Sequence, residues 1–186
     1  MIEFIPEGHI YINDGIIVPS VTQILSFILN LKLSNIPQET LKAKAEFGTA
    51  IHKAIEIGSD KGLSPIAKIS YEEWLKLKET YHIYPAQQEQ MITYKGLYCG
   101  TYDMIGDVNY TRSLLDIKTT YELNTEYLEW QLGMYKMAIN QEKELVKDCY
   151  CIWLPKKDKG QLVKIYPKKE KEILKALKDY EEHYTE

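Results

Sequence analysis

Arginine and cysteine are scarce in this sequence, and it has no long apolar run. Of the 23 basic residues only Arg112 is an arginine, the side chain that most often reads guanine edges, so we expect no sequence-specific DNA readout. The three cysteines include no Cys-x-x-Cys pair, which favours buried, reduced thiols in an intracellular protein. The first residues are acidic and no stretch is long enough to span a membrane. We therefore predict a cytoplasmic protein without membrane contact.

Length and composition favour one α/β domain. The chain has 186 residues, 45% of them hydrophobic and 27% charged, which suffices for one well-filled core. Its net charge of -4 is not typical of nucleic-acid-binding proteins, which usually carry a basic face. However, residues 147–178 contain ten lysines and four acids, whereas residues 122–144 contain five acids and two lysines. A basic binding surface and an ordinary solvated face are both compatible with the lysine-rich segment.

The rest of the chain is organised around a short apolar strand at residues 114–119. Side chains alternate along a strand, so Asp116 and Lys118 share one face while Leu115 and Ile117 share the other. Charges in an apolar strand are costly to desolvate unless they are paired or bind an ion. This makes the triplet a candidate site, although an Asp-x-Lys triplet also arises by chance about once in a chain of this size.

Local signals predict a hairpin and a helix near the N-terminus. Asp14-Gly15 suits a two-residue type I′ turn within a hairpin over residues 9–18. Ser20 and Gln23 have the spacing of a capping box, so a helix is expected to follow the hairpin at once.

A longer helix is predicted from Gln38 to Ile57, after Pro37 and ending at Gly58. Within it, Gly48 and His52 lie four apart and hence on one face. Glycine in mid-helix costs about 1 kcal/mol relative to alanine, which indicates a close approach to the backbone there. His52 is compatible both with a packed histidine and with a metal ligand. A loop over residues 60–69 and a short helix capped by Ser70 are expected next.

Three antiparallel strands are predicted after residue 88, at residues 89–94, 97–108 and 113–119. Asp103 in the middle strand can lie opposite Asp116 on the third. Two carboxylates at contact distance repel each other unless a proton or a cation lies between them, and a hard divalent cation is the natural occupant. Asp107 shares the face of Asp103, but near the turn an exposed surface acid is the simpler interpretation.

The remaining chain is predicted as helix, strand, strand and helix. Asn124 can cap a helix to about Gln141, and strands at residues 149–154 and 162–166 precede an amphipathic terminal helix. Gln131 lies in the apolar stripe of the first helix, where its amide can either satisfy a backbone group or reach into a site. From residue 38 the predicted order is helix, three strands, helix, strand.

Five short motifs follow one another along these elements: Gly48-x-x-x-His52, Glu89, Gly100-Thr101-Tyr102-Asp103, Asp116-Ile117-Lys118-Thr119 and Gln131-x-x-x-Tyr135. This series resembles the RecB-like branch of the PD-(D/E)XK nucleases. The segment Pro19-Ser20-Val21-Thr22-Gln23-Ile24-Leu25 resembles the entry segment of the mitochondrial genome maintenance exonucleases and their small phage relatives. The resemblance runs from about Pro19 to Leu154.

The resemblance implies a restriction-endonuclease-like α/β core of order αβββαβ. The catalytic core would span residues 37–154 of a single domain, 1–186. A hairpin and helix at residues 1–36 would precede the core, and a strand and helix at residues 155–186 would follow it.

The resemblance also implies a metal site. Asp103, Asp116 and the main-chain carbonyl of Ile117 would hold Mg²⁺ or Mn²⁺, and His52 would complete the shell. Imidazole suits the softer ion and so favours Mn²⁺. Family members with an iron-sulfur cluster carry four cysteines in an arrangement that this chain lacks, so no cluster is expected.

Catalytic roles follow from the same resemblance. Lys118 would orient or deprotonate the attacking water, and Glu89 would be an additional acid. Gln131 and Tyr135 would position Lys118 or the DNA strand. Metal and lysine together supply what phosphodiester hydrolysis needs, namely a nucleophile made near neutral pH and counter-charge for the phosphate.

The implied activity is a metal-dependent DNA exonuclease acting on ends, with preference for single strands. Residues 19–35 and the loop 60–69 are the segments available to roof a channel over the site. A structure-selective endonuclease of the same fold and a non-catalytic DNA-binding protein are the alternatives. A free-standing nuclease of this size fits a phage-infected or bacterial cell, where recombination or replication proteins of phage or host are expected partners.

Overall fold

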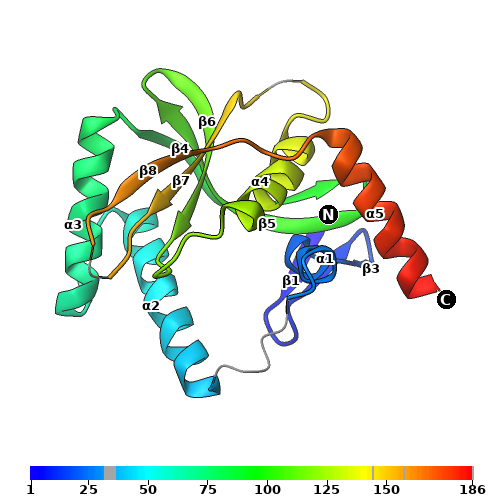
Figure 1. The fold of residues 1–186 in the computed structure, drawn as a ribbon, viewed down its shortest axis with the longest axis horizontal. Helices are drawn as coiled ribbons and strands as arrows, with labels where there is room; N and C mark the ends of the chain where they lie inside the picture. Colours follow the sequence, from blue (N-terminus) through cyan, green and yellow to red (C-terminus); the bar gives the residue numbers. More distant parts are fainter. Residues whose placement is uncertain (32–36, 144, 157, 186) are drawn as a thin grey trace.

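Five helices and two β-sheets make up the computed structural model, which describes residues 1–31, 37–143, 145–156 and 158–185 (Figure 1). The predicted α/β class is confirmed. Among the described residues, no helix combines the length and the apolar character needed to cross a membrane.

The smaller sheet is N-terminal and has the order β1-β2-β3. The predicted hairpin is confirmed: β2 (Ile10–Asn13) and β3 (Ile16–Val18) pair antiparallel, with Asn13 opposite Ile16. Both turn residues are left-handed, Asp14 at φ 50° and Gly15 at φ 81°, as a type I′ turn requires. Strand β1 (Ile2–Ile5) was not predicted, because it is held by pairing with β2 and not by a local signal.

The first two helices begin and end where the sequence predicts. Helix α1 (Val21–Ile28) starts with a complete capping box, because Ser20 Oγ accepts from Gln23 N at 3.1 Å while Ser20 N donates to Gln23 Oε1 at 2.8 Å. Helix α2 (Gln38–Ile57) ends at Gly58, whose φ of 67° gives the left-handed cap.

The predicted start of the third helix is wrong. Helix α3 (Pro65–Thr80) begins five residues before Ser70, because Ser64 Oγ accepts from Ala67 N at 3.3 Å and Pro65 takes the first helical position. Ser70 is buried inside the helix. Half of the loop predicted for residues 60–69 is therefore helical, and residues 65–69 are not free to roof a channel.

The larger sheet has the order β4-β5-β6-β7-β8, and all neighbouring strands are antiparallel except the parallel pair β6 and β7. Its strands are β4 (Tyr84–Tyr94), β5 (Tyr98–Val108), β6 (Thr111–Lys118), β7 (Asp148–Trp153) and β8 (Gln161–Ile165). Helix α4 (Thr125–Ile139) follows β6, and helix α5 (Glu170–Thr185) follows β8. The predicted meander is confirmed, with β4 beginning five residues earlier than expected.

Helices cover both faces of this sheet. Helices α1, α4 and α5 pack on one face around Leu114, and α2 and α3 pack on the other around Leu115 (Figure 1). Both leucines are fully buried, and burial of each contributes about 1.5–3 kcal/mol. The same alternation places Asp116 and Lys118 on the side of α4. The small sheet joins β5 through Tyr11, Val18 and Cys99.

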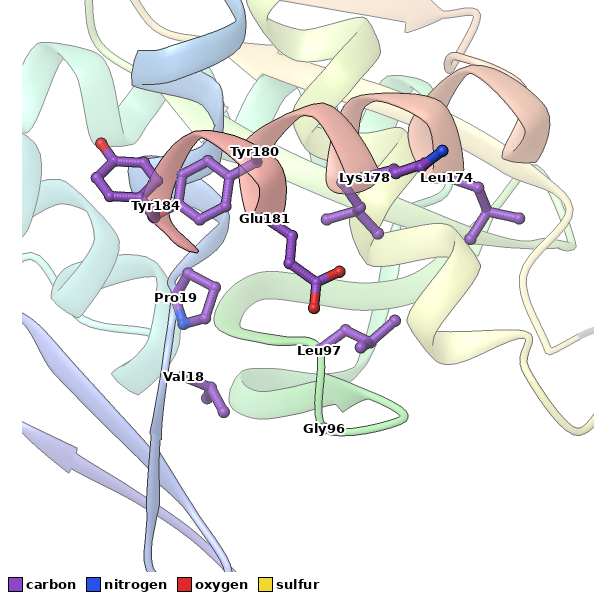
Figure 2. A pocket seen from close by; sticks show the side chains of 10 residues that line it. Val18, Pro19, Gly96, Leu97, Leu174, Lys178, Tyr180, Glu181 and Tyr184 are labelled. Carbon is purple, nitrogen blue, oxygen red and sulfur yellow. The ribbon is translucent and has the colours of Figure 1, made fainter. Parts of the chain in front are cut away.

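A groove of about 420 Å³ lies between α5, the end of β3 and the turn from β4 to β5. Figure 2 shows Tyr180 and Tyr184 of α5 on the side of Pro19, with Leu97 below the carboxylate of Glu181. None of the predicted site residues lines it. The three cysteines are all buried and unpaired, as the sequence predicts.

Candidate active site

The strand β6 holds a buried ion pair. Lys118 Nζ donates to Asp116 Oδ1 at 3.0 Å and lies 2.8 Å from Asp116 Oδ2. Helix α4 supplies a third contact, because Lys118 Nζ also donates to Gln131 Oε1 at 3.2 Å. Of the two roles open for Gln131, the structure thus shows the contact with the lysine.

Beside this pair, His52 of α2 meets two acids. His52 Nδ1 lies 3.5 Å from Glu89 Oε1 and 3.6 Å from Asp103 Oδ1. The ligand atoms of the three side chains all lie within 4.8 Å of one another, as in a group that could hold a metal ion. On its other edge His52 Nε2 lies 3.1 Å from the carbonyl oxygen of Ile117. We call His52, Glu89 and Asp103 the α2-side cluster, after the helix that contributes the histidine.

The backbone is irregular where these acids meet. Gln88 pairs with Met104 and Gln90 with Tyr102, so Glu89 lies opposite Asp103, and its φ of 49° is left-handed. A non-glycine residue in this region costs about 1 kcal/mol or more, and such strain clusters at functional sites. Between β5 and β6 a side chain takes the place of a backbone hydrogen bond, because Asp103 Oδ2 accepts from Ile117 N at 2.6 Å.

Asp116 forms the ion pair with Lys118 and also interacts with Asp103 and His52 of the α2-side cluster. It is 2% exposed. Its Oδ2 has the nearby lysine amine but no hydrogen-bond donor with suitable geometry among the described residues. A buried carboxylate oxygen without a donor is costly unless a cation compensates it. The residues present therefore fit a divalent cation with oxygen and imidazole ligands.

The close spacing of charges in the α2-side cluster shifts the pKa values of its residues. Burial alone would lower the pKa of the His52 imidazole. The hydrogen bond with Glu89 and the negative charge of Asp103 outweigh burial and raise this pKa to about 9. Burial raises the pKa of the Asp103 carboxyl, against the opposing charges of His52 and Lys118. His52 is thus a cation at neutral pH until another positive charge replaces its proton.

The pKa values of both members of the ion pair, Asp116 and Lys118, are also raised. Burial raises the pKa of Asp116 to about 6, although the Lys118 charge acts in the opposite direction. Burial would lower the pKa of Lys118, but the charges of Asp116 and Asp103 prevail and raise it above its usual range. Three acids, Glu89, Asp103 and Asp116, thus face the two cations His52 and Lys118. This imbalance leaves a place for additional positive charge.

Tyr135 lies behind Gln131 on α4 and is buried. Burial and the charge of Asp103 raise the pKa of its hydroxyl well above the usual value, while a hydrogen bond with Gln131 lowers it. The ring fits because Gly100 has no side chain: a Cβ there would lie 2.6 Å from Tyr135 Cε1. We call Lys118, Gln131 and Tyr135 the α4-side group.

The close approach predicted at Gly48 is not tight enough to require glycine. A Cβ at this position would lie 3.4 Å from Thr119 Oγ1, just after β6, which is an ordinary van der Waals contact. A cavity of about 500 Å³ runs from Gly48 past His52 to Glu89 along α2, and it connects the α2-side cluster with solvent. Asp107 lies at the surface near the turn, as in the simpler interpretation, but it is half-buried and paired with Arg112 at 2.7 and 3.3 Å.

Two neighbours of the site were missed by sequence reasoning. Tyr11 of β2 shares a hydrogen bond of 3.0 Å with Thr101, and the charge of Glu89 contributes to raising its pKa after burial. The ring of Tyr127 lies 5.8 Å from Lys118 Nζ, and its hydroxyl interacts with Thr22 of α1. Both arise from contacts between distant segments, for which the sequence carries no local signal.

The chain matches no protein-family model, and it matches none of the curated proteins with which it was compared. A solved structure, the crystal structure of SSO0001, is similar over 86% of this chain and 82% of that one, with 18% identity and a TM-score of 0.39. A similarity at this level establishes neither a family nor an activity.

Proposed function

We propose that this chain is a metal-dependent deoxyribonuclease of the RecB-like branch of the PD-(D/E)XK nucleases. The observation that carries the proposal is the pair Asp116 and Lys118 on β6, set beside the α2-side cluster. Acids that could hold a hard cation and a lysine that could face a phosphate thus lie on adjacent strands.

The order of elements supports the proposal. The order α2, β4, β5, β6, α4 and β7, with an antiparallel meander followed by a parallel strand, is what the αβββαβ core requires. Helix α3 is an addition between the first helix and the first strand. The proposal rests on this order together with the five sequence motifs and not on similarity to a solved structure.

His52, Glu89 and Asp103 would hold the ion, with Asp116 beside them, while the carbonyl of Ile117 meets the opposite edge of the imidazole at Nε2. Mn²⁺ or Mg²⁺ would supply counter-charge for the phosphate and lower the pKa of a water molecule. The imidazole in the set favours Mn²⁺. His52 must lose its proton to become a ligand, so loading of the site releases a proton.

Lys118 is assigned to charge stabilisation. Because its pKa is raised by Asp116 and Asp103, it carries a proton at neutral pH and cannot accept another. It can donate hydrogen bonds to a phosphate oxygen as negative charge develops, which is the role of a preorganised cation. Gln131 fixes its direction from α4. Removal of a proton by Lys118 would require a nearby divalent cation to lower its pKa first.

We further propose that the substrate is the end of a single strand. Helix α1 lies near the lysine, because Thr22 reaches Tyr127 and the ring of Tyr127 faces Lys118. Helix α1 would then form one side of a roof over the site. Residues 32–36, which belong to the segment proposed for the roof, lie outside the described residues. Proteins of phage or host recombination and replication would be the partners of such an enzyme.

The test compares labelled linear single strands, linear duplexes and closed circular single strands, each with Mn²⁺ or Mg²⁺ and with EDTA. We expect degradation of the linear single strand, resistance of the circle and no reaction with EDTA. An Asp116→Asn variant serves as the inactive control. Rapid nicking of circles would show an endonuclease instead. Binding without cleavage of any substrate in either metal would show a DNA-binding protein.

A further inference from the structure

A second cavity lies where the chain leaves β6. It has a volume of about 280 Å³ and is lined by residues from α2, the segment after β6 and the segment after β7: Lys44, Phe47, Thr119, Thr120, Tyr121 and Lys156. We call it the lysine–aromatic pocket. Thr119 directly follows Lys118, so the pocket adjoins the active-site lysine along the chain. Its volume is near the lower end of the roughly 300–1,000 Å³ typical of small-molecule sites and suits one nucleotide unit.

The walls of this pocket are fixed by hydrogen bonds and packing. Trp153 Nε1 donates to the carbonyl oxygen of Thr120 at 2.8 Å, and Leu154 N donates to the carbonyl oxygen of Lys118 at 2.7 Å. Phe47 is 9% exposed and belongs to the core between α2 and the sheet. Lys156 Nζ lies over its ring, 4.1 Å from the centroid. The pocket is therefore largely preformed, so a ligand would lose little binding free energy in ordering its walls.

The charges in the pocket have one sign. Lys44 and Lys156 are its only charged lining residues, and within the described part of the chain neither forms an ion pair. The cavity at the α2-side cluster has mixed charges instead, because Glu56 and Glu89 share it with Lys53 and His52. An anion is thus attracted more strongly to the lysine–aromatic pocket, although both cavities lie along α2.

Tyr121 adds a flat apolar surface at the mouth of the pocket. It is 77% exposed, so its ring is covered by little of the protein. An exposed ring beside unpaired lysines is the combination that grips single-stranded nucleic acid: bases stack on the ring and the amines face phosphates.

We propose that the lysine–aromatic pocket binds the nucleotide next to the scissile phosphate. Its base stacks on Tyr121, and its phosphate lies between Lys44 and Lys156. The two lysines offer donors to a phosphate, and the lining has no carboxylate or amide side chain, so we expect little preference for one base. This inference rests on the proposed function, because it assigns the pocket to the same substrate strand.

The experiment measures binding of a fluorescent oligothymidylate of about ten nucleotides by anisotropy, with Ca²⁺ in place of Mn²⁺ and the oligonucleotide checked for integrity afterwards. Tyr121→Ala is expected to weaken binding on the order of tenfold through lost stacking. Tyr121→Phe should retain the affinity, because the ring remains. Tyr166→Ala is the matched control, since Tyr166 is 74% exposed but follows Ile165, which pairs with Cys149 at the opposite end of β7.

The lysines are tested by salt dependence. In Lys44→Gln/Lys156→Gln the slope of log affinity against log salt should fall by roughly 1.4, since each phosphate contact to a single strand contributes about 0.7. Lys147→Gln/Lys171→Gln removes the same charge at exposed positions elsewhere and should leave the slope near that of the wild type.

Each outcome separates this inference from the proposed function. If Tyr121→Ala binds like Tyr166→Ala and the salt slope is unchanged, or if the wild type does not bind the oligonucleotide, the pocket is not a nucleotide site, whether or not the protein cleaves DNA. If binding depends on Tyr121 and the two lysines while no metal supports cleavage, the pocket assignment stands and the nuclease proposal fails.

Discussion

The two sides of β6 carry opposite kinds of chemistry. The α2-side cluster gathers two carboxylates around an imidazole, while the α4-side group holds one amine with an amide and a phenol behind it. Asp116 touches the lysine yet shares charge interactions with Asp103 and His52. Under the proposed function, cation binding and phosphate stabilisation would therefore reside in separate residues. Single substitutions should therefore remove one and leave the other.

The largest effect is expected for Lys118→Ala. Loss of the cation should lower cleavage on the order of 10²–10³-fold, as loss of a preorganised donor does in other sites. Mn²⁺ affinity should stay equal or rise, because a lysine repels the ion. Cleavage kinetics and calorimetry measure the two quantities. Lys53→Ala, which alters an exposed lysine of the α2 cavity, is the control. Near-normal turnover would make Asp-x-Lys a chance triplet.

The converse is expected for His52→Ala. Mn²⁺ affinity in calorimetry should fall about 10- to 100-fold, since even the outer partners of metal ligands contribute this much. Activity should recover partly at high Mn²⁺, because Lys118 and Gln131 are untouched. His183→Ala, at an exposed position of α5, should bind Mn²⁺ like the wild type. Unchanged Mn²⁺ affinity in His52→Ala would exclude the histidine as a ligand.

The pH dependence of stability should report the α2-side cluster without any metal. The folded-state pKa of His52, about 9, is above the unfolded value of 6.5, so its stabilisation is complete below pH 6.5 and is lost as pH rises to 9. We expect a decrease of about 2 kcal/mol across this window in the unfolding free energy of the EDTA-treated protein. Asp116 acts in the same direction but between pH 3.8 and about 6.

Denaturant unfolding at pH 6.5 and 9 measures this decrease, and His52→Gln should flatten it. Saturating Mn²⁺ should reverse the trend, because the ion binds the deprotonated imidazole. A wild-type protein whose metal-free stability is constant over this range would contradict the raised pKa of His52.

The smallest effect is expected for Gln131→Leu, which keeps the side-chain volume but removes the oxygen that accepts from Lys118. A hydrogen bond to a charged group is worth about 1.5–3 kcal/mol, part of which water recovers here, so cleavage should fall about tenfold. Mn²⁺ affinity should not change. If Gln131→Leu lost Mn²⁺ binding as well, the two sides of β6 would not be separable.

Much of the fold was predictable because its signals are local. The left-handed Gly58, the reciprocal bonds of Ser20 with Gln23 and the turn at Asp14 each follow from two or three neighbouring residues. The missed strand β1 depends on pairing with β2. The start of α3 was misplaced although Ser64 and Pro65 form an ordinary cap and first turn.

The candidate site was predictable in its residues but not in its grouping. Strand periodicity places Asp116 with Lys118, and the structure agrees. Periodicity does not reveal that Asp103 accepts from the backbone of Ile117, nor that Glu89 is left-handed and joins His52. These depend on how three strands and a helix meet, which no single segment encodes.

The bond between Trp153 and Thr120 gives the molecule a built-in optical reporter. Trp74 is a buried residue of α3 and Trp130 lies on α4 beside Lys168, whereas the Trp153 indole is fixed to the segment that forms the lysine–aromatic pocket. Indole emission shifts with the polarity and hydrogen bonding of its surroundings. In a Trp74→Phe/Trp130→Phe background, the emission of Trp153 would therefore follow occupancy of that pocket in solution without any attached dye.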